Sequence, residues 1–134
     1  MRCVYLAGPY AAYDWQGGRQ TEAANVQRAM LWHRRLIQAG HTVVCPHATI
    51  AAGGFGDDGI VAERLRGQQA SLALLDLVIE RGGGIVVLPR LDGVLSAGTQ
   101  LEYDHYCRHV VDIAKHVLIV KTDTMPLPPD WHKQ

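Results

Sequence analysis

Short apolar runs alternate with segments of helical periodicity, and this alternation constrains the fold more than any other feature of the sequence. Three of the four runs are closed by Gly or Pro, as strands that lead into turns are, and the runs cover residues 3–7, 41–45, 84–89 and 117–120. Apolar residues recur at helical spacing in residues 21–39, 60–81 and 98–107. The alternation predicts an α/β fold: one three-layer α/β/α domain over residues 1–134, with a mainly parallel, Rossmann- or flavodoxin-like sheet of about four to five strands.

The composition excludes several classes of function. A formal net charge of zero argues against a nucleic-acid or membrane partner held by bulk charge. No apolar run approaches the roughly 18 residues that a membrane span needs. The three cysteines lie far apart without the spacing of a metal site, and their odd number suggests a reduced, cytoplasmic setting. We therefore expect a small-molecule ligand in the cytoplasm, with no cofactor.

The segment from Leu95 to Glu102 has the pattern of a loop followed by the first turn of a helix. A helix start at the carboxyl edge of a parallel sheet offers free N–H groups and a positive dipole end, so Ser96, Gly98 and Thr99 are candidates to cradle an anion. Glu102 would stand beside that pocket. The alternative is a capped helix with a solvated glutamate, and the sequence leaves both open.

Other candidate binding residues follow the first two predicted strands and should lie at the same edge. Gly8, Pro9 and Tyr10 come after the first strand, and His47 comes after the second. Tyr10 suits either stacking on a ligand or packing within its own loop. His47 suits either a ligand contact or a solvated position.

A metal site is not expected. Glu102, His105 and His109 share one face of the third predicted helix, but only His41 and His47 are available as further ligands from other elements.

The chain resembles a known family at three places. Val-Tyr-Leu-Ala-Gly-Pro at residues 4–9, Asp76, and the pattern Ser96-x-Gly98-x-x-x-Glu102 after an apolar strand are similar to the nucleoside 2-deoxyribosyltransferase family, including its relatives that hydrolyse nucleoside 5′-monophosphates. The resemblance runs from about Val4 to Val120. Its most specific element is the Ser-x-Gly-x-x-x-Glu pattern.

The resemblance implies roles for four residues. Glu102 is the nucleophile that attacks the anomeric carbon, Tyr5 holds its carboxylate, and Asp76 handles the proton or orients the sugar. Ser96, with nearby backbone amides, grips a 5′-phosphate. Such a pair of acids suits the chemistry, because breaking an N-glycosidic bond passes through an oxocarbenium-like state. The expected outcome is hydrolysis of the monophosphate to free base and sugar phosphate, or transfer of the sugar between bases.

Two departures from the family pattern stand out. Gly84 opens the third strand, where relatives often have Asp, and the loop from Tyr10 to Gln20 is longer than in the phosphate-hydrolysing relatives. Arg19, in Gly17-Gly18-Arg19, is either a displaced phosphate clamp or a coincidence. Asp92-Gly93 suits a turn better than a further acid in the site.

Two other functions remain open. One is a nucleotide-binding or sensing domain without turnover. The other is a lysine-decarboxylase-like phosphoribohydrolase, whose glycine motif is faintly similar to Gly82-Gly83-Gly84 and Gly98-Thr99-x-x-Glu102. In this chain a strand and a loop separate the two parts, which makes that alternative weaker.

The chain is expected to form a homodimer or a higher homo-oligomer. A small domain with short strand-end loops leaves its ligand site open, and catalysis at the anomeric carbon needs a pocket with little water. The loop from Gly53 to Gly59 can cover one side, and the resemblance implies that a neighbouring subunit covers the other. Four apolar side chains are interpreted as outward-facing contact positions on the first two helices: Trp32, Leu36, Leu72 and Leu74.

Overall fold

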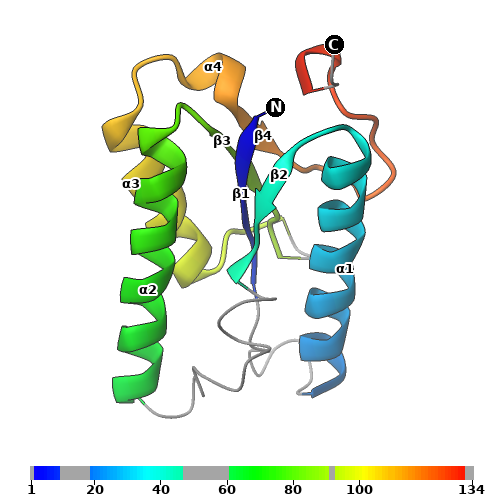
Figure 1. The fold of residues 1–134 in the computed structure, drawn as a ribbon. Coiled ribbons are helices and arrows are strands. Elements are labelled where there is room, and N and C mark those ends of the chain that lie inside the picture. Colours follow the sequence, from blue (N-terminus) through cyan, green and yellow to red (C-terminus); the bar gives the residue numbers. More distant parts are fainter. Residues whose placement is uncertain (1, 10–18, 47–60, 91–92, 132–134) are drawn as a thin grey trace.

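A computed structural model describes residues 2–9, 19–46, 61–90 and 93–131, and it confirms an α/β fold with a parallel sheet (Figure 1). The elements in chain order are β1 (Cys3–Ala7), α1 (Arg19–Gln38), β2 (Thr42–Val44), α2 (Val61–Glu80), β3 (Gly84–Val87), α3 (Ala97–His109), α4 (Ile113–His116), β4 (Val117–Ile119) and a 3₁₀ turn (Pro129–Trp131). None of the described helices has the length and apolar character needed to cross a membrane.

The strands follow the order β2-β1-β3-β4, and each pair is parallel. Tyr5 lies at the centre of the sheet, because its Cα partners are Val44 on β2 and Ile85 on β3. After β1 the chain passes through α1 to one neighbouring strand, and later through α2 to the other. The carboxyl ends of β1 and β3 therefore flank the switch point of the topology, where open α/β sheets bind their ligands.

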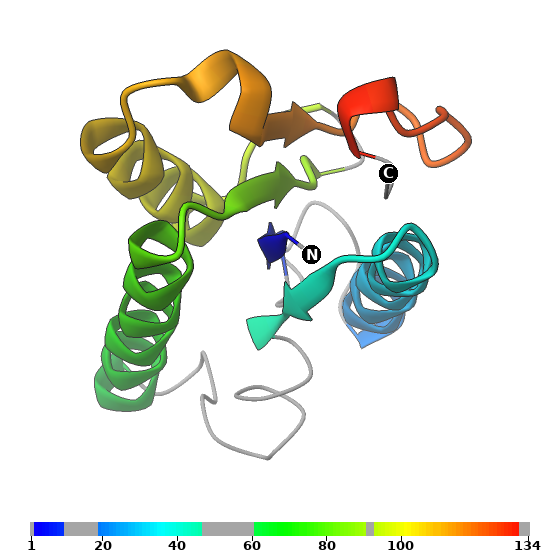
Figure 2. The same ribbon diagram turned by 45° about the horizontal axis from the view of Figure 1, so that its top comes forward.

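Successive residues of β1 face opposite sides of the sheet and separate two apolar cores. Val4 and Leu6 face α1 and the C-terminal segment (residues 121–131), whereas Tyr5 and Ala7 face α2 and α3. Figure 2 shows these two layers on either side of the sheet. The Tyr5 side of the sheet is therefore the side on which α3 can bring a functional residue.

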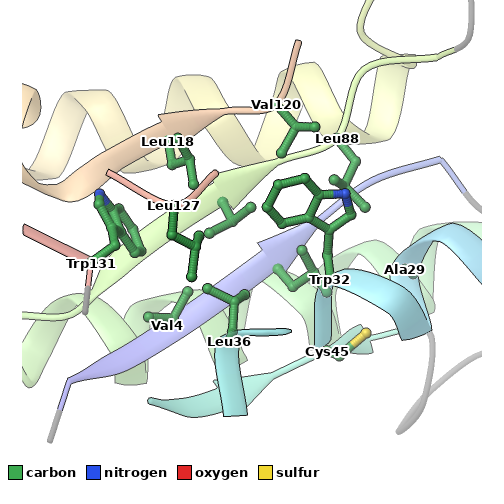
Figure 3. Close-up of a cluster of buried hydrophobic side chains, with 12 residues drawn as sticks. Val4, Ala29, Trp32, Leu36, Cys45, Leu88, Leu118, Val120, Leu127 and Trp131 are labelled. Atoms are coloured by element: carbon green, nitrogen blue, oxygen red, sulfur yellow. The ribbon is translucent and has the colours of Figure 1, made fainter. Parts of the chain in front are cut away.

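The buried face of α1 differs from the predicted one. Trp32 and Leu36 were expected to face outward as dimer contacts, but both are fully buried in the first core (Figure 3). Asn25 and Ala29 complete the same face, at spacings of four and three residues that match the helical period. Ile37 is 48% exposed instead. The prediction that Trp32 and Leu36 face outward as subunit contacts is therefore wrong.

The C-terminal segment covers the part of this core that α1 leaves open. This segment contains Pro126, Pro128 and Pro129, and proline cannot continue a helix or a central strand. In the structure Leu127 and Trp131 are buried against the sheet, in the same core as Trp32 (Figure 3). The Asp123 carboxylate accepts hydrogen bonds from Arg28 Nε at 2.7 Å and from Trp32 Nε1 at 3.1 Å. The segment is thus a structural part of the α1 layer.

Gly84 has a packing role that accounts for the absence of an acidic residue there. A Cβ atom at this position would lie 2.9 Å from the ring of Trp131 and 2.8 Å from the carbonyl oxygen of His116. An aspartate would therefore require the C-terminal segment to move.

The neighbouring glycines lie at the amino edge of the sheet. Gly82 has a φ of 68° just after α2, and a Cβ on Gly83 would lie 2.2 Å from the carbonyl oxygen of Cys3. Gly98, by contrast, follows the carboxyl end of β3. The two glycine groups therefore sit at opposite ends of a strand, and the structure does not favour the joint phosphate-binding motif of the phosphoribohydrolase alternative.

Candidate functional site

Ser96 is the N-cap of α3. Its Oγ accepts a hydrogen bond from the backbone N–H of Thr99 at 3.2 Å, and the Gln100 N–H donates to the Ser96 carbonyl at 2.8 Å. The predicted loop and helix start are confirmed, and so is the capping arrangement. Because the cap uses the N–H of Thr99, only earlier N–H groups of the turn remain for an anion.

The two hydroxyl groups of this turn are directed at each other. Ser96 Oγ and Thr99 Oγ1 lie 2.7 Å apart, and both residues are buried. A Cβ built on Gly98, by contrast, meets no heavy atom within 4 Å. A ligand at this helix start would therefore approach the backbone of Gly98 more readily than the hydroxyl of Ser96.

Glu102 is not a solvated glutamate. Its Oε2 atom is buried, and no described residue gives that oxygen a hydrogen bond of ordinary geometry. Burial raises the pKa of Glu102 from 4.5 to about 7, and the nearby hydroxyl of Tyr5 offsets part of this rise. Near neutral pH this carboxyl group can therefore be present in both its charged and its neutral form.

Tyr5 reaches the same place from the sheet. Its side chain is fully buried, and its hydroxyl also has no hydrogen bond of ordinary geometry among the described residues. Burial raises the pKa of Tyr5 well above its ordinary value, and the charge of Glu102 raises it further. Tyr5 is thus a neutral phenol beside Glu102, with a proton available for that carboxylate.

Ser71 is a member of this group that sequence reasoning missed. Its hydroxyl interacts with Tyr5 and partly lowers the raised pKa of that phenol. Ser71 shares the sheet-facing side of α2 with Leu75 and Val78, at spacings of four and three residues. That helical period was the available signal, because a serine in phase with buried residues is directed inward.

Asp76 lies elsewhere on α2. Its side chain is 51% exposed, and its Oδ1 atom lies 2.6 Å from Nε2 of His105 on α3. Asp76 also does not contribute to the raised pKa of Glu102. The structure therefore brings together Tyr5 and Glu102, and it pairs Asp76 with His105.

The remaining predicted residues divide into three groups. Gly8 has a packing role, because an added Cβ would lie 3.0 Å from Cβ of Leu88, so glycine lets the ends of β1 and β3 approach each other. Pro9 is buried beside it. Tyr10, His47 and the loop from Gly53 to Gly59 lie outside the described residues. Of Arg19, the structure describes only the backbone, as the first residue of α1.

The turn predicted at Asp92-Gly93 is supported by its neighbours. Gly93 has a φ of 85°, its N–H donates to the Arg90 carbonyl, and the Arg90 N–H donates to the Val94 carbonyl, both at 2.8 Å. Gly93 is therefore a turn residue, which agrees with the predicted use of the dipeptide.

The histidines of α3 bind protein groups. His109 Nδ1 lies 2.7 Å from the carbonyl oxygen of His105, and the two rings are 4.4 Å apart. In the part of the chain that the structure describes, no group of three or more His, Cys, Asp or Glu side chains is arranged to hold a metal ion.

Tyr5 and Glu102 form a pair of neighbouring acidic groups whose pKa values are both raised. A carboxyl group that titrates near neutrality lies next to a phenol, beside the switch point of the sheet, and strongly shifted acids of this kind concentrate at functional sites. Comparison of the chain with protein-family models, curated proteins and solved structures gave no match.

Proposed function

We propose that this protein cleaves the N-glycosidic bond of a nucleoside 5′-monophosphate, with Glu102 as the nucleophile. The observation that carries the proposal is the burial of the Glu102 carboxylate beside the hydroxyl of Tyr5. A carboxylate with little water around it is a better nucleophile toward an electron-poor carbon than a fully hydrated one.

The reaction has two steps. Ionised Glu102 attacks the anomeric carbon as the bond to the base breaks, and the leaving base takes a proton from solvent water. Water then attacks the same carbon, gives up a proton to solvent, releases the Glu102 carboxylate and yields the sugar phosphate. If a second base takes the place of water, the product is a new nucleotide.

Tyr5 serves as the group that orients the nucleophile. A phenol hydroxyl can donate a hydrogen bond to one carboxylate oxygen and leave the other free to attack. Its high pKa keeps the proton on the phenol throughout the working range of pH. Tyr5 therefore orients the Glu102 carboxylate and does not itself act as a nucleophile.

The start of α3 supports a phosphorylated substrate. The positive end of the helix dipole and the early N–H groups of the turn suit a dianionic phosphate, and the open space around Gly98 lets it approach. A phosphate there would lie on the same helix as Glu102, one turn before it. The sugar of a 5′-monophosphate would then lie between the two groups.

A homodimer remains part of the proposal, with a corrected contact surface. Trp32 and Leu36 belong to the core, and Leu72 and Leu74 are partly buried against the second core. On α2 the exposed apolar side chains are instead Leu65 and Leu77, at 51% and 54% of their surface. Leu65 and Leu77 lie about three helical turns apart, and they are the contact positions proposed for a two-fold interface. Light scattering should give a mass near twice the 14.7 kDa of the chain. A monomeric mass at concentrations where the protein is fully active would remove the dimer from the proposal.

The function is tested by incubating the protein with a panel of nucleosides and 5′-monophosphates and measuring free base by chromatography. Free base should appear from a monophosphate with wild-type protein and not with Glu102→Gln. Asp104→Asn is the matched control, because this exposed acid on the same helix contacts only Gln100 among the hydrogen bonds described. A monophosphate that binds to the protein and stays intact would contradict the enzyme and support a sensing domain without turnover.

A further inference from the structure

Asp76 and His105 form a direct link between α2 and α3. The Oδ1 and Nε2 atoms are 2.6 Å apart, slightly shorter than the roughly 2.7–2.9 Å usual for a charged N–H···O hydrogen bond. The His105 side chain is only 18% exposed, so this link fixes a mostly buried ring. Its only described carboxylate partner is Asp76.

Asp76 lies on a different face of α2 from the residues that pack on the Tyr5 side of the sheet. Leu75 and Val78 are fully buried and face the sheet, whereas Asp76 is half exposed on another face of the helix. Asp76 also lies one turn before α2 ends at the amino edge of the sheet, and the ligand is expected beyond the opposite edge. Nothing in this arrangement directs the Asp76 carboxylate at a sugar.

His105 is placed to transmit the effect of Asp76 to Glu102. The two residues are three positions apart on α3, so their Cβ atoms are neighbours on the helix surface. Glu102 and Tyr106 face the sheet, and the Tyr106 hydroxyl donates to the Gly83 carbonyl at 2.8 Å. The link to α2 and the bond to Gly83 together fix how α3 is rotated about its own axis, and that rotation sets the position of the Glu102 carboxylate relative to Tyr5.

We propose that Asp76 is a positioning residue, which holds His105 and through it the turn of α3 that carries Glu102, and which does not itself contact the substrate. This inference rests on the proposed function for its catalytic meaning. The structural part of the inference is that the Asp76–His105 link sets the surroundings of Glu102. This part can be tested by measurements that need no turnover of substrate.

The test compares Asp76→Ala, Asp76→Asn, His105→Ala and the double alanine variant. The first measurement is the pH titration of the Glu102 carboxyl carbon by NMR. Asp76→Ala and His105→Ala should each move the Glu102 pKa toward the ordinary glutamate range, because a loosened α3 admits water, and the double variant should add nothing further. Asp76→Asn should keep the wild-type value, since its amide oxygen can still accept from His105. Gln100→Ala, which removes the exposed Gln100–Asp104 bond within α3, is the control and should change nothing.

The second measurement is turnover of the monophosphate. Asp76→Ala and His105→Ala should each lower kcat on the order of 10-fold with little change in KM, because the nucleophile is displaced while the phosphate contacts remain. Asp76→Asn should restore most of the rate. If Asp76→Asn is as damaging as Asp76→Ala while His105→Ala is neutral, Asp76 acts on the substrate and the proposal is overturned.

The two measurements separate this inference from the proposed function. An unchanged Glu102 titration in both alanine variants overturns the positioning role, whatever the activity. If no monophosphate is cleaved by the wild-type protein but the titration shifts as expected, the positioning role stands and the proposed reaction fails.

Discussion

Burial raises the pKa of both Tyr5 and Glu102, and the two groups then act on each other in opposite directions: the hydroxyl lowers the pKa of Glu102, and the carboxylate raises that of Tyr5. This relationship means that Tyr5 stays protonated while Glu102 titrates close to neutrality. The folded protein must therefore hold the Glu102 carboxyl group in the same buried position, in its neutral form at low pH and in its charged form at high pH.

The first prediction concerns the stability of Glu102→Gln. The folded pKa of Glu102, about 7, lies above the ordinary value of 4.5, so its contribution to stability is fully present below pH 4.5 and is lost as the pH rises through 7. The wild-type protein should lose at most about 3 kcal/mol of unfolding free energy from this group by pH 8. Glu102→Gln should not show this loss and should be the more stable protein at pH 8. Urea unfolding at pH 5 and pH 8 measures the difference, and equal slopes with pH for both proteins would contradict the burial of this charge.

The second prediction concerns the pH profile of turnover. A nucleophilic Glu102 must be ionised, so kcat/KM should fall about tenfold for each pH unit below about 7. Tyr5→Phe removes the group that lowers the Glu102 pKa, and the acid limb should move to higher pH. Steady-state rates between pH 5 and 9 measure both effects. An acid limb that stays in place in Tyr5→Phe would remove Tyr5 from contact with the nucleophile.

The third prediction separates the two possible uses of Ser96. Ser96→Ala removes the α3 cap and should cost about 1 kcal/mol of stability, whereas Ser96→Asp keeps a good capping side chain and should cost less. Binding should follow the reverse order, because the charge of Asp repels the phosphate of a 5′-monophosphate. Nucleosides should be affected little by either change. Calorimetric titration and thermal unfolding of the two variants provide the comparison, and equal loss of nucleosides and monophosphates would take Ser96 out of the phosphate site.

The fourth prediction concerns the C-terminal segment. Trp131 is 3% exposed, packs against Gly84 and lies under the guanidinium group of Arg2, whose Cζ is 4.9 Å from the ring centroid. Trp131→Ala should cost about 3–5 kcal/mol of stability, and Trp131→Phe clearly less. The activity per folded molecule should stay unchanged, since the residue lies at the amino edge of the sheet. Urea unfolding tests this, and a cost below about 1 kcal/mol would contradict the packing described.

Local signals in the sequence were sufficient to predict the strands, the long helices and the start of α3. Gly and Pro mark the ends of the apolar runs, and the Ser96 cap follows from side-chain chemistry within one turn. These features depend on neighbouring residues, so a single sequence contains them.

The rotation of each helix about its axis could not be predicted in the same way. The inner face of α1 includes polar Asn25 and small Ala29, which carry no apolar signal, while apolar Ile37 lies outside. The same difficulty affects Asp76, whose distance from Glu102 along the chain suits the family pattern although its side chain turns toward His105. Helix rotation is set by long-range contacts such as that between Trp32 and Asp123, which spacing does not reveal.

The seating of the C-terminal segment on the first core also has a consequence for the folding reaction. Val4 and Leu6 near one end of the chain share a core with Leu127 and Trp131 near the other, so completing this core requires contacts between residues more than 100 positions apart. Contacts of such high sequence separation slow a folding reaction, because a long loop must be closed to form them. Before the C-terminal segment packs on the sheet, the apolar sheet face beneath it is exposed to water. Exposed apolar surface of this kind promotes association between partly folded chains.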